Sequence, residues 1–396
     1  MTTKRKMRNS FRAAMLLVLA AGYVGCEVSS EWAQRSARDN SIAIMTWNVQ
    51  LLFDMVEEGM GFRDFQESGG WTREKYMGRL NVIARAIGEM ERKPDIIALQ
   101  EVGSAQVIAD LADALSAHRY NWAHFARLPG MAMGVGLLSR YPLEGARAHA
   151  IDIDGDIIPR PILEARVNMP GRAPQAFAEG ADSLGMDGFS LALFVCHWKS
   201  KRGGAAETES TRRAAARVVL RRMRELAQTN PSLPVIVVGD LNVTHDEFAR
   251  SGGAYLKALM PDDPGAAEFA IAYFFGGASA DDAPPANELQ RDFLVVSHSK
   301  PPEARHFPEG VLALYSPWTV EKEGGSFLFR NSWETIDHFL LSAHLFGGIG
   351  WEFYDSQALR VPPFVTAEGL PNAYNPRTGR GISDHVPLML FLRMRE

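Results

Sequence analysis

Carboxylate, carboxamide and imidazole side chains border apolar stretches at several distant places in this sequence. The segment "VIVVGDLN" ends a run of β-branched residues with Asp240 and Asn242, two positions apart. Because strand side chains alternate between faces, the two could project together from one strand end, and Gly239 would permit close approach of a backbone or ligand. A turn would satisfy the same letters, because Gly, Asp and Asn dominate turns. The rest of the chain must decide between these interpretations.

The same kind of position recurs along the chain. The residues concerned are Asn48 in "TWN", Glu101 in "IIALQE", His197 in "FVCHW", Asp337 in "TIDHF", and Asp384 with His385 in "SDHVPLMLFL". Each alone has an ordinary explanation as a solvated strand end, a structural histidine or a turn cap. Polar groups at the strand ends of an α/β fold converge on one rim, where ligands usually bind. We therefore expect these residues to form one site.

The residue types narrow the chemistry of such a site. Carboxylate and carboxamide oxygens without a cysteine cluster favour a hard cation, Mg²⁺ or alternatively Mn²⁺. The histidines suit phosphate contact or proton transfer. A P-loop motif and a G-x-S-x-G motif are both missing, so nucleotide hydrolysis by a P-loop and serine hydrolysis lack support. The remaining chemistry is metal-assisted attack of water on a phosphoester.

Composition describes a folded protein without a global basic field. The chain has 396 residues, of which 46% are hydrophobic and 22% charged, and its net charge is −5. A polyanion site must therefore be a local patch. The length allows one large domain or two ordinary ones, and the absence of a repeat or a second composition regime predicts one domain, residues 41–396.

The first 26 residues, "MTTKRKMRNSFRAAMLLVLAAGYVGC", have a basic start, an apolar run and small residues before a cysteine. This pattern predicts a secretory signal peptide, and "YVGC" resembles a lipobox that would attach lipid at Cys26. An apolar cytosolic helix is the alternative. Polar residues 27–40 predict a tether, and we expect a periplasmic, cell-envelope or extracellular protein. Cys196 then has no intramolecular partner and is expected in the core.

Apolar periodicity predicts strands alternating with amphipathic helices. The expected helices span 72–92, 104–118 and 207–228. The expected strands are 42–48, 95–101, 134–140, 161–167, 189–198, 235–240, 326–330, 335–342, 350–355 and 386–393. Two polar regions, 170–188 and 258–290, are expected to be irregular loops. Strands connected both by helices and by hairpins indicate a mixed sheet arrangement with outer helices.

The ordered set "TWN … LQE … HWKS … GDLN … IDHFLLS … SDHVPL" resembles the endonuclease/exonuclease/phosphatase superfamily, which includes pancreatic deoxyribonuclease, abasic-site endonucleases and sphingomyelinases. The resemblance runs from about residue 42 to 393. It implies an α/β four-layer sandwich, in which two packed mixed β-sheets are flanked by helices. It also implies a divalent-metal site at the sheet edges.

The resemblance also assigns roles by position. It implies metal-site positions at Glu101, Asn48 and Asp384. It implies catalytic positions at Asp240, Asn242, His197, His385 and Asp337. In this assignment Asp240 orients or deprotonates the attacking water, Asn242 and His197 help hold the phosphate, and His385 contacts the scissile phosphate while Asp337 orients it and keeps it cationic.

Three basic residues are candidates for substrate binding. Arg160 lies where several members keep a phosphate-contacting arginine, with a surface arginine as the alternative. Lys199 and Lys201 follow His197 within a local basic cluster that continues to Arg212 and Arg213, and sequence-independent contact with a polyanion backbone is expected of the two lysines. The aromatic segments 315–318 and 329–333 could bind bases or lipids, or lie in the core, and apolar 272–277 is a candidate membrane contact.

These observations lead to one principal reading with two alternatives. The principal hypothesis is an exported, Mg²⁺-dependent nuclease of low sequence specificity, expected to be a monomer. The first alternative is a sphingomyelinase-like phospholipid phosphodiesterase that acts on a headgroup. The second is a surface binding module that has lost catalysis. Gln50 occupies the place of an aspartate in abasic-site enzymes, which together with His197 argues against dedicated DNA repair.

Overall fold

The computed structural model describes residues 41–55, 62–169, 188–276, 289–318, 324–348 and 350–395. The predicted signal peptide, Cys26, the tether and nearly all of the predicted 170–188 loop lie outside the described residues. Within the described ranges, no helix has the length and apolar character needed to cross a membrane.

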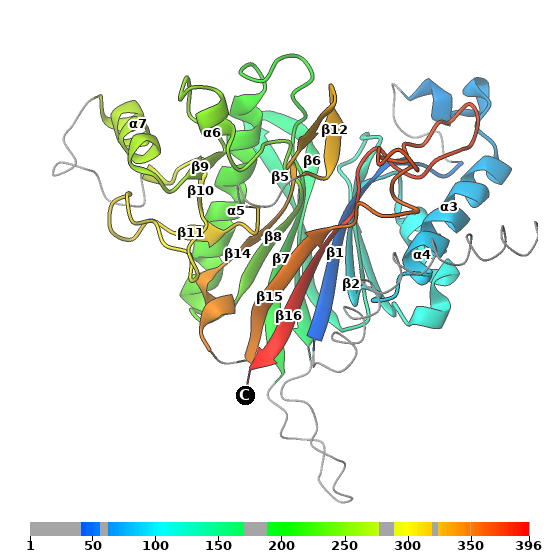
Figure 1. Ribbon diagram of the computed structural model, residues 1–396, viewed down its shortest axis with the longest axis horizontal. Coiled ribbons are helices and arrows are strands. Elements are labelled where there is room, and N and C mark those ends of the chain that lie inside the picture. The colour runs from blue at the N-terminus through cyan, green and yellow to red at the C-terminus, as the bar shows by residue number, and fades with distance from the viewer. Residues whose placement is uncertain are drawn as a thin grey trace, which may run out of the picture.

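Two mixed β-sheets form the centre of the molecule (Figure 1). The six-stranded sheet has the order β15 (Gly350–Ala358), β16 (Leu388–Arg395), β1 (Ser41–Leu52), β2 (Ile96–Val102), β4 (Gly134–Ser139), β3 (Trp122–Ala126). The eight-stranded sheet has the order β5 (Leu143–Ile153), β6 (Asp156–Met169), β7 (Phe189–His197), β8 (Val235–Asp240), β14 (Asp337–Leu341), β11 (Ala313–Tyr315), β10 (Leu294–Ser297), β9 (Leu259–Pro261). Strands β12 (Phe327–Phe329) and β13 (Ser332–Glu334) form a separate hairpin.

Alternation along the strands explains why the sheets pack face to face. In β1, Ile42 and Ile44 lie in the core between the sheets, whereas Ala43 and Met45 lie in the core beneath the helices. The same alternation divides β8, whose even-numbered apolar residues face the other sheet and whose odd-numbered ones face away. Strands that bury both faces read as continuous apolar runs, which is why 235–238 carries no polar residue.

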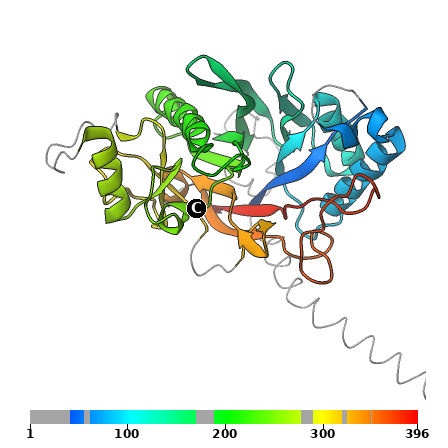
Figure 2. The same ribbon diagram turned by 90° about the horizontal axis from the view of Figure 1, so that it is seen from above.

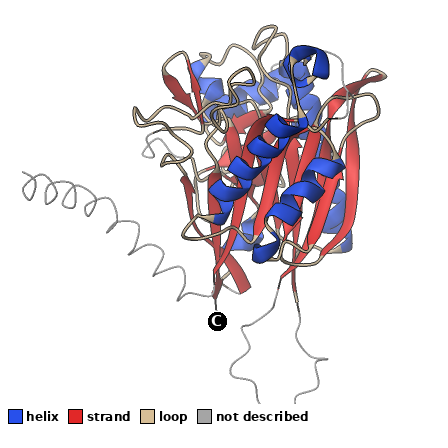
Figure 3. Cartoon of the chain, turned by 90° about the vertical axis from the view of Figure 1, so that its right-hand side faces the viewer, coloured by secondary structure: helices blue, strands red, loops and turns tan. Residues whose placement is uncertain are grey.

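Helices cover both outer faces and complete the predicted four-layer α/β sandwich. Helices α3 (Arg73–Gly88) and α4 (Ala105–Ala114) cover the six-stranded sheet, as Figure 3 shows. Helix α5 (Glu209–Thr229) packs on the opposite side, against the eight-stranded sheet (Figure 2). Side chains of Thr72 and Ser104 cap the first two helices by accepting from main-chain N–H groups three residues on. Helix α6 (Glu247–Arg250) is a single turn.

One expectation about the fold was wrong. Residues 258–290 do not form one irregular loop, because they contain β9 and helix α7 (Pro264–Phe275), with 277–288 outside the described residues. Asp263 accepts from the N–H of Ala266, Pro264 occupies the first turn, and Gly276 ends the helix at φ 66°. These are standard start and stop signals, hidden by the Pro, Gly and Ala content of the surrounding region. Of the segment 272–277, expected to be a loop, residues 272–275 are the last turn of this helix and Gly276 is its C-cap.

Candidate active site

Strand alternation brings four of the predicted residues to the same end of the space between the sheets. Asn48 continues the inward-facing set of β1, and Asp240 continues the inward-facing set of β8. His197 pairs in register with Asp240 on one side, and Asp337 pairs with Asp240 on the other. The apolar interlayer therefore ends in a polar cluster contributed by both sheets, as expected from the sequence.

Asn48 links the two sheets directly. Its Nδ2 donates to Oδ2 of Asp240 (3.0 Å) and to Oε1 of Glu101 (3.3 Å), and its Oδ1 accepts from the N–H of Gln50 (2.9 Å). Glu101 reaches the cluster because β2 has a bulge there. The pairing of β2 with both β1 and β4 shifts register between Gln100 and Val102, and Glu101 itself has a positive φ of 63°. A bulge re-aims a side chain and often lies beside an active site. Asn48 thus holds two carboxylates at one place.

Asn242 reaches the site differently from the prediction. Strand β8 ends at Asp240, and Asn242 has a left-handed φ of 53° instead of continuing the strand face. Its N–H donates to Oδ1 of Asp240 (3.0 Å), and its Nδ2 donates to the carbonyl of Trp198 (3.1 Å). Gly239 is required at φ 130°, because a Cβ there would lie 2.0 Å from the carbonyl oxygen of Cys196. Gly239 therefore permits the close approach of the neighbouring strand β7.

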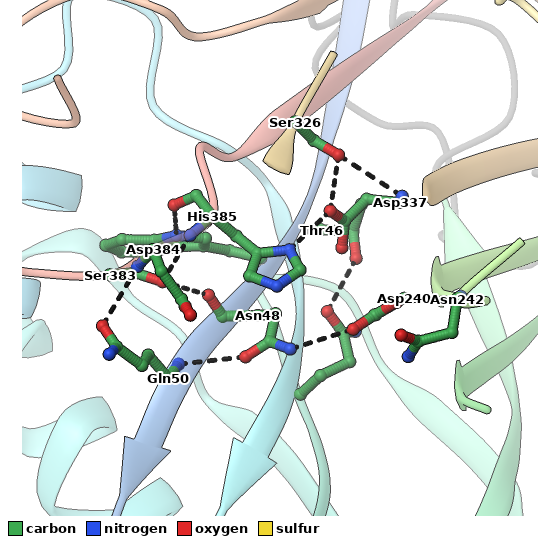
Figure 4. A network of polar contacts seen from close by, with 12 residues as sticks. Thr46, Asn48, Gln50, Asp240, Asn242, Ser326, Asp337, Ser383, Asp384 and His385 are labelled. Carbon is green, nitrogen blue, oxygen red and sulfur yellow. Dashed lines mark hydrogen bonds and ion pairs between the residues drawn. The ribbon is translucent and has the colours of Figure 1, made fainter. Parts of the chain in front are cut away.

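His385 and Asp337 form a buried ion pair (Figure 4). Nδ1 of His385 lies 2.7 Å from Oδ2 of Asp337, which also accepts from the hydroxyl of Ser326 (2.5 Å). The ring of Phe327 packs on the imidazole at a centroid distance of 4.6 Å. Burial disfavours the imidazolium, but the charge and hydrogen bond of Asp337 outweigh it and raise the pKa of His385 to about 10. The histidine is therefore cationic at neutral pH.

The remaining acids crowd one another. Burial, and then the neighbouring Asp337 carboxylate, raise the pKa of Asp240 to about 7. Burial and the charge of Asp384 raise the pKa of Glu101 above its usual range. Like charges held together in a partly dry site oppose ionisation. A group whose pKa lies near neutrality can accept a proton from water and return it, which suits Asp240 to general-base chemistry.

His197 has the opposite protonation state from His385. Its Nε2 lies 3.6 Å from Oδ2 of Asp240 and 3.7 Å from Oε1 of Glu101, and its side chain is 3% exposed. Burial and the positive charges of Arg160 and His385 lower the pKa of His197 well below its usual value. The neutral ring can offer a hydrogen bond without adding charge, while His385 supplies the cation.

Arg160 lies within this site rather than on an unrelated surface. Its guanidinium donates to the carbonyl of Trp198, the same oxygen that Asn242 binds. Burial lowers the pKa of Arg160, while the charges of Glu101 and Asp240 act to raise it. The Trp198 carbonyl therefore orients both Arg160 and Asn242. Arg160, predicted from the sequence, lies near the predicted carboxylates of Glu101 and Asp240.

The two lysines predicted to bind substrate have different surroundings. Lys199 is partly exposed, and its ammonium donates to the main-chain carbonyls of Ser200 and Arg202. The structure does not bring Lys201 to the cluster, because its Nζ lies 2.5 Å from Oε2 of the buried Glu247. Arg212, expected in the same basic surface cluster, is fully buried and holds Glu209 and the carbonyl of Lys199 instead. Charge spacing alone did not reveal these internal partners.

The donor set fits a hard divalent cation. Among the described residues, Asp240, Asp337 and His385 have ligand-type atoms within 4.8 Å of one another, but His385 and Asp337 already bond each other. The partly exposed Glu101 carboxylate, with the charge of Asp384 near it, is a better centre for an oxygen-rich site. Oδ1 of Asp337 is buried without a hydrogen-bond partner among the described residues. A cation would relieve this concentration of negative charge.

Several residues that build the site were not predicted. Ser383 donates to the carbonyl of Asn48 (2.7 Å), and Trp47 donates through Nε1 to the carbonyl of His385 (3.0 Å). Ser326 holds Asp337, as described above, and its carbonyl accepts from the N–H of Val386 (2.8 Å). The serine in "SDH" stood beside the motif and could have been found, but no sequence signal marked Ser326.

Comparison with known protein families shows to which family the chain belongs. The model of the "Endonuclease/Exonuclease/phosphatase family" matches residues 45–385. The chain belongs to this family. Members of the endonuclease/exonuclease/phosphatase family are hydrolases of the nuclease and phosphatase kinds, and the match includes every strand end that contributes to the site. A search of curated proteins finds no match.

Solved structures with similar folds include members from bacteria and humans. A family protein from Bacteroides thetaiotaomicron has 15% identity and a TM-score of 0.46, with 91% of this chain and 100% of that chain covered. A mannosyl-6-phosphatase of the same organism has 15% identity, a TM-score of 0.44 and coverages of 89% and 99%. The human nocturnin catalytic domain with bound sulfate has 15% identity, a TM-score of 0.47 and coverages of 90% and 94%.

Proposed function

We propose that the chain is an exported, divalent-metal-dependent phosphodiesterase that hydrolyses nucleic acid with little sequence preference. The observation that carries the proposal is the convergence of Glu101, Asn48 and Asp240 with the His385–Asp337 pair at one end of the sandwich. Acids for a cation, a near-neutral carboxylate and a fixed imidazolium are the groups that attack on an anionic phosphodiester requires.

Each side chain has a defined task in this proposal. Glu101, with Asp384 beside it, would hold Mg²⁺ or Mn²⁺, which supplies charge neutralisation at a phosphate oxygen when bound. Asp240 accepts the proton of the attacking water. His385 and Arg160 place positive charge against the phosphate oxygens, and their positions are fixed before substrate arrives. Asn48 keeps the two acids at their separation.

The surroundings of the site favour a polyanionic chain as substrate. Lys199 is partly exposed next to the site, and the exposed Arg202 follows it. Both lie on the segment that begins at His197, so they extend the positive charge of Arg160 beyond a single phosphate. Contacts of this kind bind any sequence, which is why low sequence specificity is proposed.

Export and lipid attachment at Cys26 are part of the proposal and follow from the signal-type N-terminus. The described chain begins at Ser41, seven residues before Asn48 on the same strand (Figure 1). At about 3.3 Å per strand residue, the entry point lies ~23 Å from the site. An anchor would therefore join the sandwich at the end away from the site, and this arrangement favours a substrate in solution.

A phospholipid headgroup is the second candidate substrate. It is favoured by the tip of the β12–β13 hairpin, where Phe329 is 47% exposed beside Arg330, two residues from the Phe327 ring that contacts His385. An exposed ring next to a cation can enter an interface or stack on a base. The substrate test below separates these uses.

The test measures hydrolysis of plasmid DNA, RNA and sphingomyelin vesicles by the purified mature chain with Mg²⁺, and with EDTA. We expect acid-soluble nucleotides, none with EDTA, and none from His385→Ala, whereas His344→Ala at an exposed position away from the site keeps wild-type activity. Release of phosphocholine without nucleotides would establish the lipid alternative. No cleavage of any phosphodiester under these conditions would reject the proposal. Mass spectrometry of the mature N-terminus tests processing at Cys26.

A further inference from the structure

The backbone segment that carries Asp384 and His385 has little local structure to hold it. Between the end of β15 and the start of β16, residues 359–387 form turns and isolated bridges, without a helix or an extended strand. Turns of this kind do not fix a side chain to the precision that catalysis requires. The position of Asp384 and His385 must therefore come from contacts with the rest of the protein.

Gln50 makes three hydrogen bonds to the main chain of this segment, one of them at Asp384. Its Oε1 accepts from the N–H groups of Tyr374 (2.7 Å) and Asp384 (3.0 Å), and its Nε2 donates to the carbonyl of Tyr374 (3.2 Å). In Figure 4, dashed lines join Gln50 to Asn48 and to the main chain at Asp384. A carboxamide combines an acceptor oxygen with donor hydrogens, so one side chain can satisfy both kinds of main-chain group.

Arg79 of α3 holds the backbone on either side of Gln50. Its side chain is buried, and its guanidinium donates to the carbonyls of Val49 (2.6 Å), Gln50 and Leu51 (2.9 Å). Gln50 and Leu51 have φ of 52° and 60°, a conformation that non-glycine residues adopt rarely. The guanidinium carbon also lies 3.8 Å from the centroid of the Tyr374 ring. Arg79 thus fixes the backbone that aims Gln50 and packs against the residue that Gln50 binds.

We propose that Arg79 and Gln50 act as positioning residues, a clamp that sets Asp384 and His385 against Glu101 and Asn48. The catalytic consequence rests on the proposed function, whereas the clamp itself follows from the contacts. Among the described residues, neither side chain bonds the Asp240 carboxylate or the His385–Asp337 pair. They therefore act through the turn that carries Asp384 and His385. This turn places Asp384, an acid of the proposed metal site, beside the His385 imidazole.

The test uses the full mature chain and the variants Gln50→Met, Gln50→Glu and Arg79→Met. Methionine approximates the size of glutamine but makes none of its bonds, whereas glutamate keeps the oxygen that accepts from the two N–H groups. Gln106→Met is the matched control, because Gln106 is exposed on α4 and its side chain donates to Asp110 on the same helix. Amide hydrogen exchange at Tyr374 and Asp384 measures the clamp without reference to activity.

We expect Gln50→Met to lose at least about tenfold protection at the Tyr374 and Asp384 amides, and to lose ~10- to 100-fold in kcat with KM within about threefold. Gln50→Glu should restore the protection, Arg79→Met should resemble Gln50→Met, and Gln106→Met should resemble the wild type. Wild-type protection and kcat in folded Gln50→Met would overturn the clamp. An inactive wild-type chain would reject the proposed function instead, while the exchange comparison would still decide the clamp.

Discussion

Replacing Asp337 with asparagine tests how the site keeps His385 cationic. The two side chains are buried, and Nδ1 lies 2.7 Å from Oδ2. With Asp337 present the pKa of His385 is about 10, against an ordinary value of 6.5. The difference corresponds to on the order of 5 kcal/mol between the two protonation states. Asparagine keeps the shape but removes the charge, while the burial that opposes the imidazolium remains. We therefore expect the pKa of His385 to fall to 6.5 or below.

The variant should then lose activity in a pH-dependent way. At pH 8, about 99% of the wild-type histidine is cationic, but at most about 3% of the variant histidine is. Protonation alone therefore predicts a loss of kcat/KM of at least ~30-fold at pH 8 and a much smaller loss at pH 6. The assay is kcat/KM on a nucleic acid substrate from pH 5.5 to 9 at saturating Mg²⁺.

The His385–Asp337 pair should also make the free energy of unfolding depend on pH. A raised folded-state pKa contributes stability fully below the unfolded value of 6.5, and the contribution disappears as the pH rises through about 10. Denaturant unfolding should therefore separate wild type and Asp337→Asn more at pH 6 than at pH 10. If their activity ratio is constant with pH, or if the His385 ring titrates identically by ¹⁵N NMR in both, the reasoning fails.

Three further predictions concern other parts of the site. Asp240→Asn should lower kcat by about 10³-fold with an unchanged circular dichroism spectrum, since it removes the proposed base; activity near that of the wild type would contradict the assignment. Gly239→Ala should destabilise the protein by at least ~2 kcal/mol in chemical unfolding, because of its φ and the backbone contact at 2.0 Å; an unchanged midpoint would be the adverse result. Lys199→Ala should reduce the slope of log binding against log salt by ~0.7–0.9, whereas Lys201→Ala should leave the slope unchanged and cost about 1 kcal/mol of stability through Glu247. Equal slopes for the two variants would remove Lys199 from the proposed substrate contacts.

Local signals were sufficient for much of the fold. The continuous apolar run at 235–238 predicted a buried strand, and "TWN" and "LQE" marked two others, because a strand between two layers excludes polar residues until it ends. Short strands such as Ala313–Tyr315 were missed, since three residues carry no periodicity. Helix α7 was missed because it lies in a region whose alanines, glycines and prolines give the composition of a loop.

The sequence by itself determined which residues could perform the chemistry. Asn48, Asp240 and His197 each follow an apolar run, which predicted that they share one rim, and in the structure alternation along their strands places them on the face between the sheets. Tertiary structure alone decided how they meet: the β2 bulge turns Glu101 inward, and Arg79 with Gln50 holds the turn of Asp384. Periodicity reports which face a side chain occupies, because that is set by neighbours along the chain. Bulge positions, left-handed residues and buried partners depend on segments hundreds of residues away, so no local pattern records them.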